Sequence, residues 1–418
     1  MIATVRTVAL ADDRPLLDLL PATPDALAWV RDGEGLVAWG VAARLDPGPG
    51  ADRFTRAGAA LARLAADAEV SDEVLLPGTG LVAVGSFTFE ARAPGSVVVV
   101  PRVVVGRRQG VTWRTDITPS DGPTTPPPPP VPVGAAARRP RRDRPRYAGS
   151  SLPDVHWLEA VARAVKRIQA GEADKVVLAR DHAVWSREPF DPLDLARRLT
   201  ARFPRCHTFV VDGLVGATPE LLLAKRGGAI TSRVLAGTTG RSVDEARDAA
   251  LGAALLASEK DRAEHAYAAA SVAEVLAPRC TDLAGDPEPR LLRLDNVQHL
   301  ATTYRGNLED PTTSVLDLVG ALHPTAAVGG TPREVALRMI TELEGMARGR
   351  YAAPVGWLDA AGDGEWGIAL RCAELQGARA RLFAGVGVVA ASLPEAELEE
   401  TRLKLRAMQA VLDADEPL

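Results

Sequence analysis

Two pairs of acidic residues have the type and spacing to hold a metal ion. Asp261 and Glu264 are three residues apart in the segment SEKDRAEH, and Glu397 and Glu400 are three apart in ELEETRLK. Residues three apart on a helix share one face, and two facing acidic faces would offer the oxygen ligands that Mg²⁺ prefers. Acidic pairs on helices more often face water, so the spacing alone leaves both interpretations open.

Lys175, Glu220 and two histidines carry side chains that can move protons. Lys175 opens the apolar segment KVVLAR, and burial disfavours the charged form of a lysine, which suits it to act as a base. Glu220 lies between a turn and an apolar segment in GATPELLL, where loss of water favours a protonated carboxyl that can donate. For both, the alternative is a charged end that reaches solvent. His299 and His323 fit hydrogen-bonded core positions better than catalytic ones.

Candidate anion-binding groups lie in glycine-rich and basic segments. LAGTTGR contains Gly237 and Thr238, and AGVGV contains Gly385. We expect both segments to be loops whose backbone N–H groups can approach a carboxylate, although such loops are often only turns. Arg371 and Lys404 could each pair with a carboxylate.

Hydrophobic periodicity predicts the elements that position these residues. Apolar residues at helical spacing predict helices over 54–66, 152–170, 192–203, 244–276, 315–322, 332–343 and 394–412. Strands are expected over 35–41, 81–89, 175–183, 208–211, 221–225, 354–357, 365–375 and 379–389, with a hairpin over 95–105 and 111–117. Helices and strands do not alternate regularly, which favours an α+β fold with antiparallel sheets over a doubly wound one.

Composition limits the partners and the compartment. The chain has 418 residues, 46% hydrophobic and 25% charged, with a formal net charge of −5, so nothing in its charge favours nucleic acid or an anionic membrane. Cys206, Cys280 and Cys372 are odd in number and far apart, which argues against disulfides and structural zinc. Residues 1–20 contain charges inside what would be a signal core, and no apolar run is long enough to cross a bilayer. We therefore expect a cytoplasmic protein.

A proline- and arginine-rich segment over 118–147 divides the chain. It contains five consecutive prolines at 126–130 and six arginines between 138 and 146, a composition that forms neither a helix nor a central strand. We predict a linker between an N-terminal part of the fold, 1–117, and a catalytic region, 148–418. The arginines could bind an anion or a partner, but a solvated spacer is the simpler interpretation.

From about Leu152 to Val411 the chain resembles the chorismate-utilising enzymes. The matching blocks, in order, are KVVLAR, GATPELLL, LAGTTGR, SEKDRAEH, QHLATTYRG, HPTAAVGGTP, RGRYAAPVGW, GEWGIALRCAEL, LFAGVGVV and EETRLKL. The likeness is strongest to the isochorismate synthases, which add water at C2 of chorismate and remove the C4 hydroxyl. It implies a large sandwich of facing antiparallel sheets with helices outside.

The resemblance also implies roles for individual residues. Lys175 matches the base that activates water, and Glu220 matches the acid that protonates the leaving hydroxyl. The Mg²⁺ ligands would be Glu264 and Glu400 directly, and Asp261 and Glu397 through waters. The positions matching substrate contacts are Gly237, Thr238, His299, Ala327, Tyr351, Arg371, Gly385 and Lys404. The family usually has proline at the position of Ala326 and glycine at that of Ala353, and neither departure removes a catalytic group.

Related activities differ in identifiable segments. Anthranilate synthases follow the AEH triplet with a pattern that the segment AYAAASV lacks, and aminodeoxychorismate synthases have a lysine where this chain has Ala236. Salicylate synthase, which goes on to eliminate pyruvate, is the alternative hardest to exclude, and a catalytically silent relative is a third. We expect a monomer or weak homodimer that acts on chorismate with Mg²⁺, needs no amidotransferase, and serves menaquinone or salicylate and siderophore synthesis.

Overall fold

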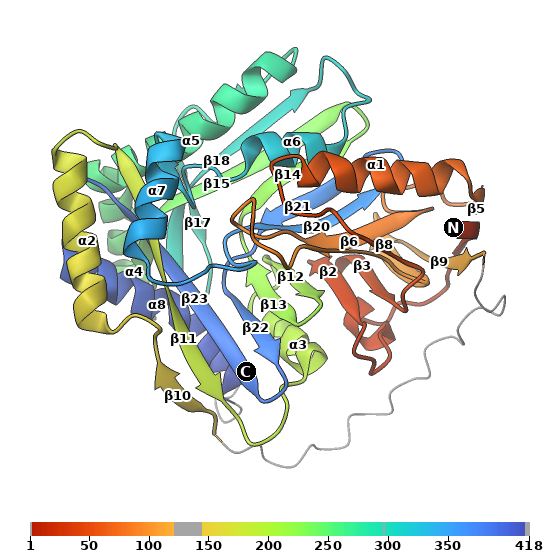
Figure 1. The fold of residues 1–418 in the computed structure, drawn as a ribbon, viewed down its shortest axis with the longest axis horizontal. Helices are drawn as coiled ribbons and strands as arrows, with labels where there is room; N and C mark the ends of the chain where they lie inside the picture. Colours follow the sequence, from red (N-terminus) through yellow and green to blue (C-terminus); the bar gives the residue numbers. More distant parts are fainter. Residues whose placement is uncertain (1, 121–143, 296, 414–418) are drawn as a thin grey trace.

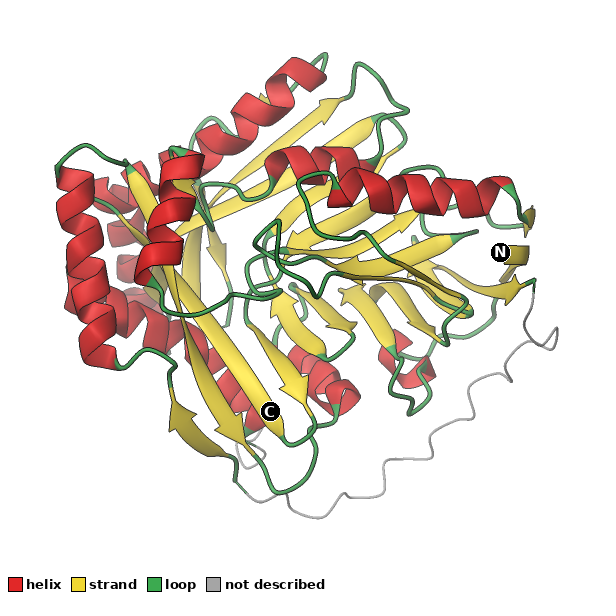
Figure 2. Cartoon of the chain, viewed as in Figure 1, coloured by secondary structure: helices red, strands yellow, loops and turns green. Residues whose placement is uncertain are grey.

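Two large β-sheets form the centre of the molecule, and helices cover their outer faces (Figures 1 and 2). The computed structural model describes residues 2–120, 144–295 and 297–413. The sheets pack through a shared apolar core, and Trp29 in one sheet donates an indole hydrogen bond of 3.1 Å to Glu365 in the other. The predicted α+β sandwich is confirmed.

Both sheets are antiparallel apart from one edge pair, β1 with β5. The first sheet has the order β10 (Arg146–Gly149), β11 (Lys175–Trp185), β23 (Arg379–Val388), β22 (Cys372–Gln376), β13 (Leu214–Thr218), β12 (His207–Val211), β2 (Leu27–Arg31), β3 (Glu34–Trp39), β8 (Val103–Arg108), β9 (Val111–Pro119), β1 (Ile2–Ala9) and β5 (Glu69–Asp72), with β19 (Gly330–Thr331) beside β11. The second has the order β16 (Ala284–Gly285), β18 (Val297–Asn307), β15 (Ala229–Gly240), β14 (Leu221–Arg226), β21 (Gly364–Ile368), β20 (Pro354–Asp359), β6 (Val82–Ser86), β7 (Val97–Val100) and β4 (Ala43–Leu45), with β17 (Arg290–Arg293) beside β18.

Strands from before and after the proline-rich segment therefore share both sheets. β2 pairs with β12 in the first sheet, and β6 pairs with β20 in the second. Most of the predicted linker, residues 121–143, lies outside the described residues. The sheets are continuous across the N-terminal part and the predicted catalytic region.

Amphipathic helices pack on the sheets through their apolar faces. They are α1 (Arg53–Ala66), α2 (Asp154–Gln169), α3 (Pro192–Arg202), α4 (Glu245–Ala257), α5 (Glu259–Leu276), α6 (Val315–Leu322), α7 (Arg333–Leu343) and α8 (Pro394–Leu412), with 3₁₀ turns η1 (Leu16–Leu19) and η2 (Ala277–Arg279). In the described part of the chain, no helix combines the length and apolar character needed to cross a membrane. The three cysteines are buried and free, as predicted.

The single helix predicted over 244–276 is wrong, because Ser258 divides it into α4 and α5. Ser258 has extended backbone angles, and its hydroxyl accepts a hydrogen bond of 3.3 Å from the backbone N–H of Asp261. This is an N-cap, which starts a new helix. Asp261 and Glu264 therefore lie in the first turns of α5.

The strand predicted over 365–375 is also wrong, because the chain crosses between the sheets there. β21 belongs to the second sheet and β22 to the first, and Arg371 between them has a positive φ of 48°. The long strands β15 and β18 were not predicted, and in β15 the reason is that LAGTTGR was interpreted as a loop. The segment lies mostly within β15, where Gly237 has a φ of +73° at a register shift. The predicted glycine-rich loop at Ala384–Val388 lies in β23.

A buried ion pair fixes β11 against the segment that follows α6. Arg348 and Glu344 are ion-paired and almost fully buried. The Arg348 guanidinium donates to the carbonyl oxygens of Val328 at 2.7 Å and Val177 at 2.8 Å. Glu344 accepts from the backbone N–H of Ala179 at 2.8 Å. The pair thus joins three backbone segments through charge-assisted hydrogen bonds.

We predict that Arg348→Ala destabilises the protein by about 3–5 kcal/mol, because it leaves the Glu344 carboxylate buried without a partner. Urea unfolding followed by circular dichroism measures this loss. Arg290→Ala is the matched control, since Arg290 is 74% exposed and lies 3.6 Å from Asp286; it should cost at most about 1 kcal/mol. Equal losses in the two variants would contradict the role given to the buried pair.

Candidate active site

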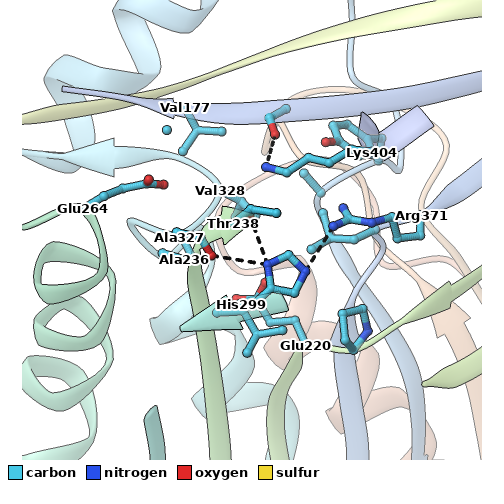
Figure 3. Close-up of a pocket in the computed structure, with 18 of the residues that line it drawn as sticks. Val177, Glu220, Ala236, Thr238, Glu264, His299, Ala327, Val328, Arg371 and Lys404 are labelled. Atoms are coloured by element: carbon cyan, nitrogen blue, oxygen red, sulfur yellow. Dashed lines mark hydrogen bonds between the residues drawn. The ribbon is translucent and has the colours of Figure 1, made fainter. Parts of the chain in front are cut away.

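Most of the predicted site residues line one cavity where the two sheets and helices α5 and α8 meet (Figure 3). β11 and β23 supply part of its wall from the first sheet, and β15 and β18 supply part from the second. The predicted residues in the wall are Glu220, Gly237, Thr238, Glu264, His299, Ala327, Tyr351, Arg371, Gly385 and Lys404. His323 does not line it; this buried ring contacts the carbonyl oxygen of Phe89 at 3.1 Å and is a core histidine.

Glu220 brings a carboxyl into the cavity wall that stays protonated near neutral pH. It lies between β13 and β14 and is 3% exposed. Burial raises its pKa to about 8, although the nearby positive charge of Lys175 lowers it. In the described residues, no cationic side chain forms a salt bridge with Glu220. The group is therefore a proton donor at neutral pH.

Lys175 lies behind the cavity wall and is fully buried. Its Nζ is 3.3 Å from Oε1 of Glu264 and 3.4 Å from the backbone oxygen of the same residue. We expected Lys175 to be partly buried, and the structure buries it completely. Glu264 lines the same cavity as Glu220, so Lys175 is held next to the wall that contains Glu220.

His299 connects the polar groups of β15 to Arg371. Its Nδ1 is 3.0 Å from Oγ1 of Thr238 and 3.4 Å from the oxygen of Gly237, and its Nε2 is 3.3 Å from Nη2 of Arg371 (Figure 3). Arginine can only donate, so Nε2 must accept and the proton sits on Nδ1. Burial lowers the pKa of His299 well below its usual value, and the positive charge of Arg371 lowers it further. His299 is thus a neutral residue that orients Arg371.

Lys404 and Tyr351 form the side of the cavity next to β23. The Lys404 ammonium is 2.7 Å from Oε1 of Glu400 and donates to the oxygen of Gly385 at 2.8 Å. Tyr351 stacks on Phe383 with ring centroids 4.9 Å apart, and burial raises the pKa of its hydroxyl. A Cβ at Gly385 would come within 3.0 Å of that hydroxyl, so a side chain there would press on Tyr351.

The four carboxylates predicted to bind metal lie on α5 and α8, and each has a partner. Glu264 pairs with Lys175 and Glu400 pairs with Lys404. Glu397 pairs with Lys260 at 2.6 Å, and Asp261 accepts from the Ser258 hydroxyl at 2.5 Å. Over residues 2–120, 144–295 and 297–413, no three acidic, histidine or cysteine side chains form a ready metal cluster.

The donor chemistry still suits a hard cation. Glu397 is 1% exposed; burial raises its pKa, and the negative charge of Glu400 raises it further. Burial alone would lower the pKa of Lys260, but the attraction of Glu397 outweighs it. Glu400 and Glu264 raise the pKa of Lys260 as well. The carboxylates of Glu264, Glu397 and Glu400, from two helices, therefore all attract the same ammonium. They would be able to hold a cation if they turned away from their lysine partners.

Several residues of the wall were not predicted. One of them is Gly387 on β23. A Cβ at this position would collide with Glu264 and come within 2.9 Å of Cε of Lys175. Its place in the sequence GVGV beside Gly385 could have revealed it. Arg348 and the apolar lining lie inside the matching blocks, but nothing in their type or spacing singled them out as wall residues. The apolar lining is Val177, Pro219, Leu235, Ala236, Val328, Ala352 and Leu370.

Comparisons with known proteins identify the family of the chain. A family model described as chorismate binding enzyme matches residues 135–413. The chain is 40% identical over 270 residues to isochorismate synthase DhbC of Bacillus subtilis, across 62% of this chain and 68% of the relative. It is 35% identical over 365 residues to the putative isochorismate synthase MenF of Mycobacterium tuberculosis, across 84% and 91%.

The same family is found among solved structures. The crystal structure of a putative 2,3-dihydroxybenzoate-specific isochorismate synthase, DhbC, from Bacillus anthracis superposes with a TM-score of 0.78 at 29% identity. The superposition covers 95% of this chain and 98% of that one. The chain belongs to the chorismate-binding enzymes.

Proposed function

We propose that this protein is an isochorismate synthase that uses Mg²⁺ to convert chorismate into isochorismate. The observation that carries the proposal is the protonated Glu220 carboxyl in the wall of a cavity that Glu264 also lines, with the buried Lys175 held against Glu264. Water is a poor nucleophile and hydroxide a poor leaving group at neutral pH. A base and an acid on opposite sides of one ring address both difficulties. The names of the relatives support the same activity.

In this mechanism two side chains exchange protons with the substrate. Lys175 takes a proton from water as its oxygen bonds to C2 of the ring. The ring double bonds shift, the C4–oxygen bond breaks, and Glu220 gives its proton to the departing hydroxyl, which leaves as water. One water enters and one leaves, so atoms and charge balance. To take this proton Lys175 must be a neutral amine, so its ammonium first has to leave the Glu264 carboxylate and give up a proton.

The cavity has the charge to bind a substrate with two carboxylates. Arg371 is held by His299, and Lys404 is held by Gly385 and Glu400. Both cations face the cavity, and arginine in particular matches a carboxylate with two parallel N–H groups. Thr238 and Tyr351 add hydroxyls. The positive groups would fix the ring between Lys175 and Glu220.

Glu264 and Glu400 would hold Mg²⁺, with Asp261 and Glu397 acting through waters. The ion would neutralise the ring carboxylate of the substrate. Since the nucleophile is water, the reaction needs no ammonia and no amidotransferase. Isochorismate would then be used in menaquinone synthesis or in making salicylate or siderophores.

Incubation of the purified protein with chorismate and Mg²⁺, followed by chromatography, tests the proposal. We expect isochorismate, no product when EDTA is present, and full recovery when Mg²⁺ is added in excess. Pyruvate together with a fluorescent aromatic product would instead identify a salicylate synthase. Turnover that EDTA leaves unchanged would exclude the metal.

Lys175→Ala should lower kcat by at least about 10²-fold, because it removes the base, while the protein still folds and binds Mg²⁺. Steady-state assays and calorimetric metal titration measure these effects. Lys225→Ala is a matched control, since Lys225 is also buried and paired, but with Asp363 at 2.6 Å, which does not line the cavity, whereas the partner of Lys175, Glu264, does. Normal turnover by Lys175→Ala would remove Lys175 from the mechanism.

The pH dependence should reflect Glu220. Its protonated form is the donor, so activity should be present below its pKa of about 8 and decline as the pH rises through that value. The measurement is kcat/KM from about pH 6 to pH 10, with Glu220→Gln, which keeps the shape but has no proton to give, expected to be inactive across the range. An activity that stays constant up to about pH 10 would be incompatible with this assignment.

A further inference from the structure

Lys260 joins the two helices that carry the acidic residues. It lies in the first turn of α5, and its Nζ is 2.6 Å from Oε1 of Glu397 on α8. The Lys260 side chain is 29% exposed, whereas that of Glu397 is 1% exposed. The Lys260 side chain is therefore partly open to solvent, whereas the Glu397 carboxylate is shielded from solvent.

The surroundings of Lys260 are the carboxylates assigned above to Mg²⁺. Glu264 is four residues further along α5 and shares its face. Glu400 is one turn from Glu397 on α8, and both Glu264 and Glu400 attract the Lys260 ammonium. Lys260 thus places its positive charge in the region that a divalent ion would occupy.

The other two lysines that pair with these carboxylates, Lys175 and Lys404, have different roles. Lys175 and Lys404 hold Glu264 and Glu400, and both belong to the chemistry or to substrate binding. The ion pair of Lys260 is instead with Glu397, a carboxylate that has no part in the proton transfers proposed above. Its remaining interaction is with the carboxylates themselves.

We propose that Lys260 is a built-in counter-cation of the carboxylate site, which competes with the divalent ion and leaves Glu397 when that ion binds. The inference rests on the proposed function in one respect, that these carboxylates bind Mg²⁺. The physical reason is that a buried carboxylate without a cation is costly, while two cations on one set of carboxylates repel. The lysine stabilises the fold and at the same time weakens metal binding.

Calorimetric titration of the whole protein with Mg²⁺ at pH 8, without substrate, tests the competition. Lys260→Met keeps the length of the side chain and removes its charge, so we expect a Kd lower by about tenfold, or about 1.4 kcal/mol. Arg262→Met is the control, because it removes a positive charge two residues away that pairs with Glu288 at 3.1 Å; its Kd should stay within about twofold. An unchanged or higher Kd for Lys260→Met overturns the proposal.

A second measurement uses the unaltered protein and does not depend on the variant folding. Lysine acetylation followed by mass spectrometry gives the labelling rate of each ammonium. Saturating Mg²⁺ should raise the rate at Lys260 several-fold, because the ion releases it from Glu397, and should leave the exposed Lys166 on α2 unchanged. A Lys260 rate that Mg²⁺ leaves unchanged or lowers overturns the proposal.

These results are separable from the test of the proposed activity. A protein that shows the Lys260 effects but yields no isochorismate refutes the activity and leaves the counter-cation in place. A protein that makes isochorismate but lacks both effects refutes the counter-cation alone. Absence of Mg²⁺ binding refutes the inference together with the metal part of the proposed function.

Discussion

The site depends on how buried carboxylates are compensated by lysines. Glu264 and Glu400 each have an ammonium within 3.3 Å, and such pairing makes it possible to keep a charge away from water. Glu220 has no such partner in the described residues, and burial raises its pKa to about 8. The same physical cost therefore yields two kinds of carboxyl within one region: some that are paired with an ammonium, and one without such a pair that keeps a proton to give.

The backbone allows this arrangement because glycines bring β23 close to the charged groups. A side chain at Gly387 would meet both Glu264 and Lys175, and one at Gly385 would meet the Tyr351 hydroxyl. The bulge at Gly237 turns β15 beside His299. The buried pair of Arg348 and Glu344 fixes β11 behind the cavity. The antiparallel strands supply rigid positions, and the glycines permit an approach that a strand with larger side chains would prevent.

The sequence predicted which residues share a cavity better than it predicted the backbone that carries them. The fold class, the apolar face of α8 and most of the cavity wall follow from periodicity and from the matching blocks. The break at Ser258 was missed, although serine followed three residues later by Asp261 is typical of a helix start. β15 was missed because glycine in a bulge resembles glycine in a loop. The pairing of Lys260 with Glu397 joins residues 137 apart in sequence, and no local pattern contains such a contact.

Charge balance gives a reason for the metal and the substrate to bind together. On the proposed function, chorismate brings two negative charges and Mg²⁺ brings two positive ones, so their joint entry adds no net charge to a largely buried site. Either one alone leaves a charge for which the side chains have to compensate, and burying an uncompensated charge is costly. Lys404 illustrates the constraint, since the ammonium that faces the cavity is held by Glu400. A cation that takes Glu400 frees Lys404 for a substrate carboxylate, so each ligand removes part of the cost of binding the other.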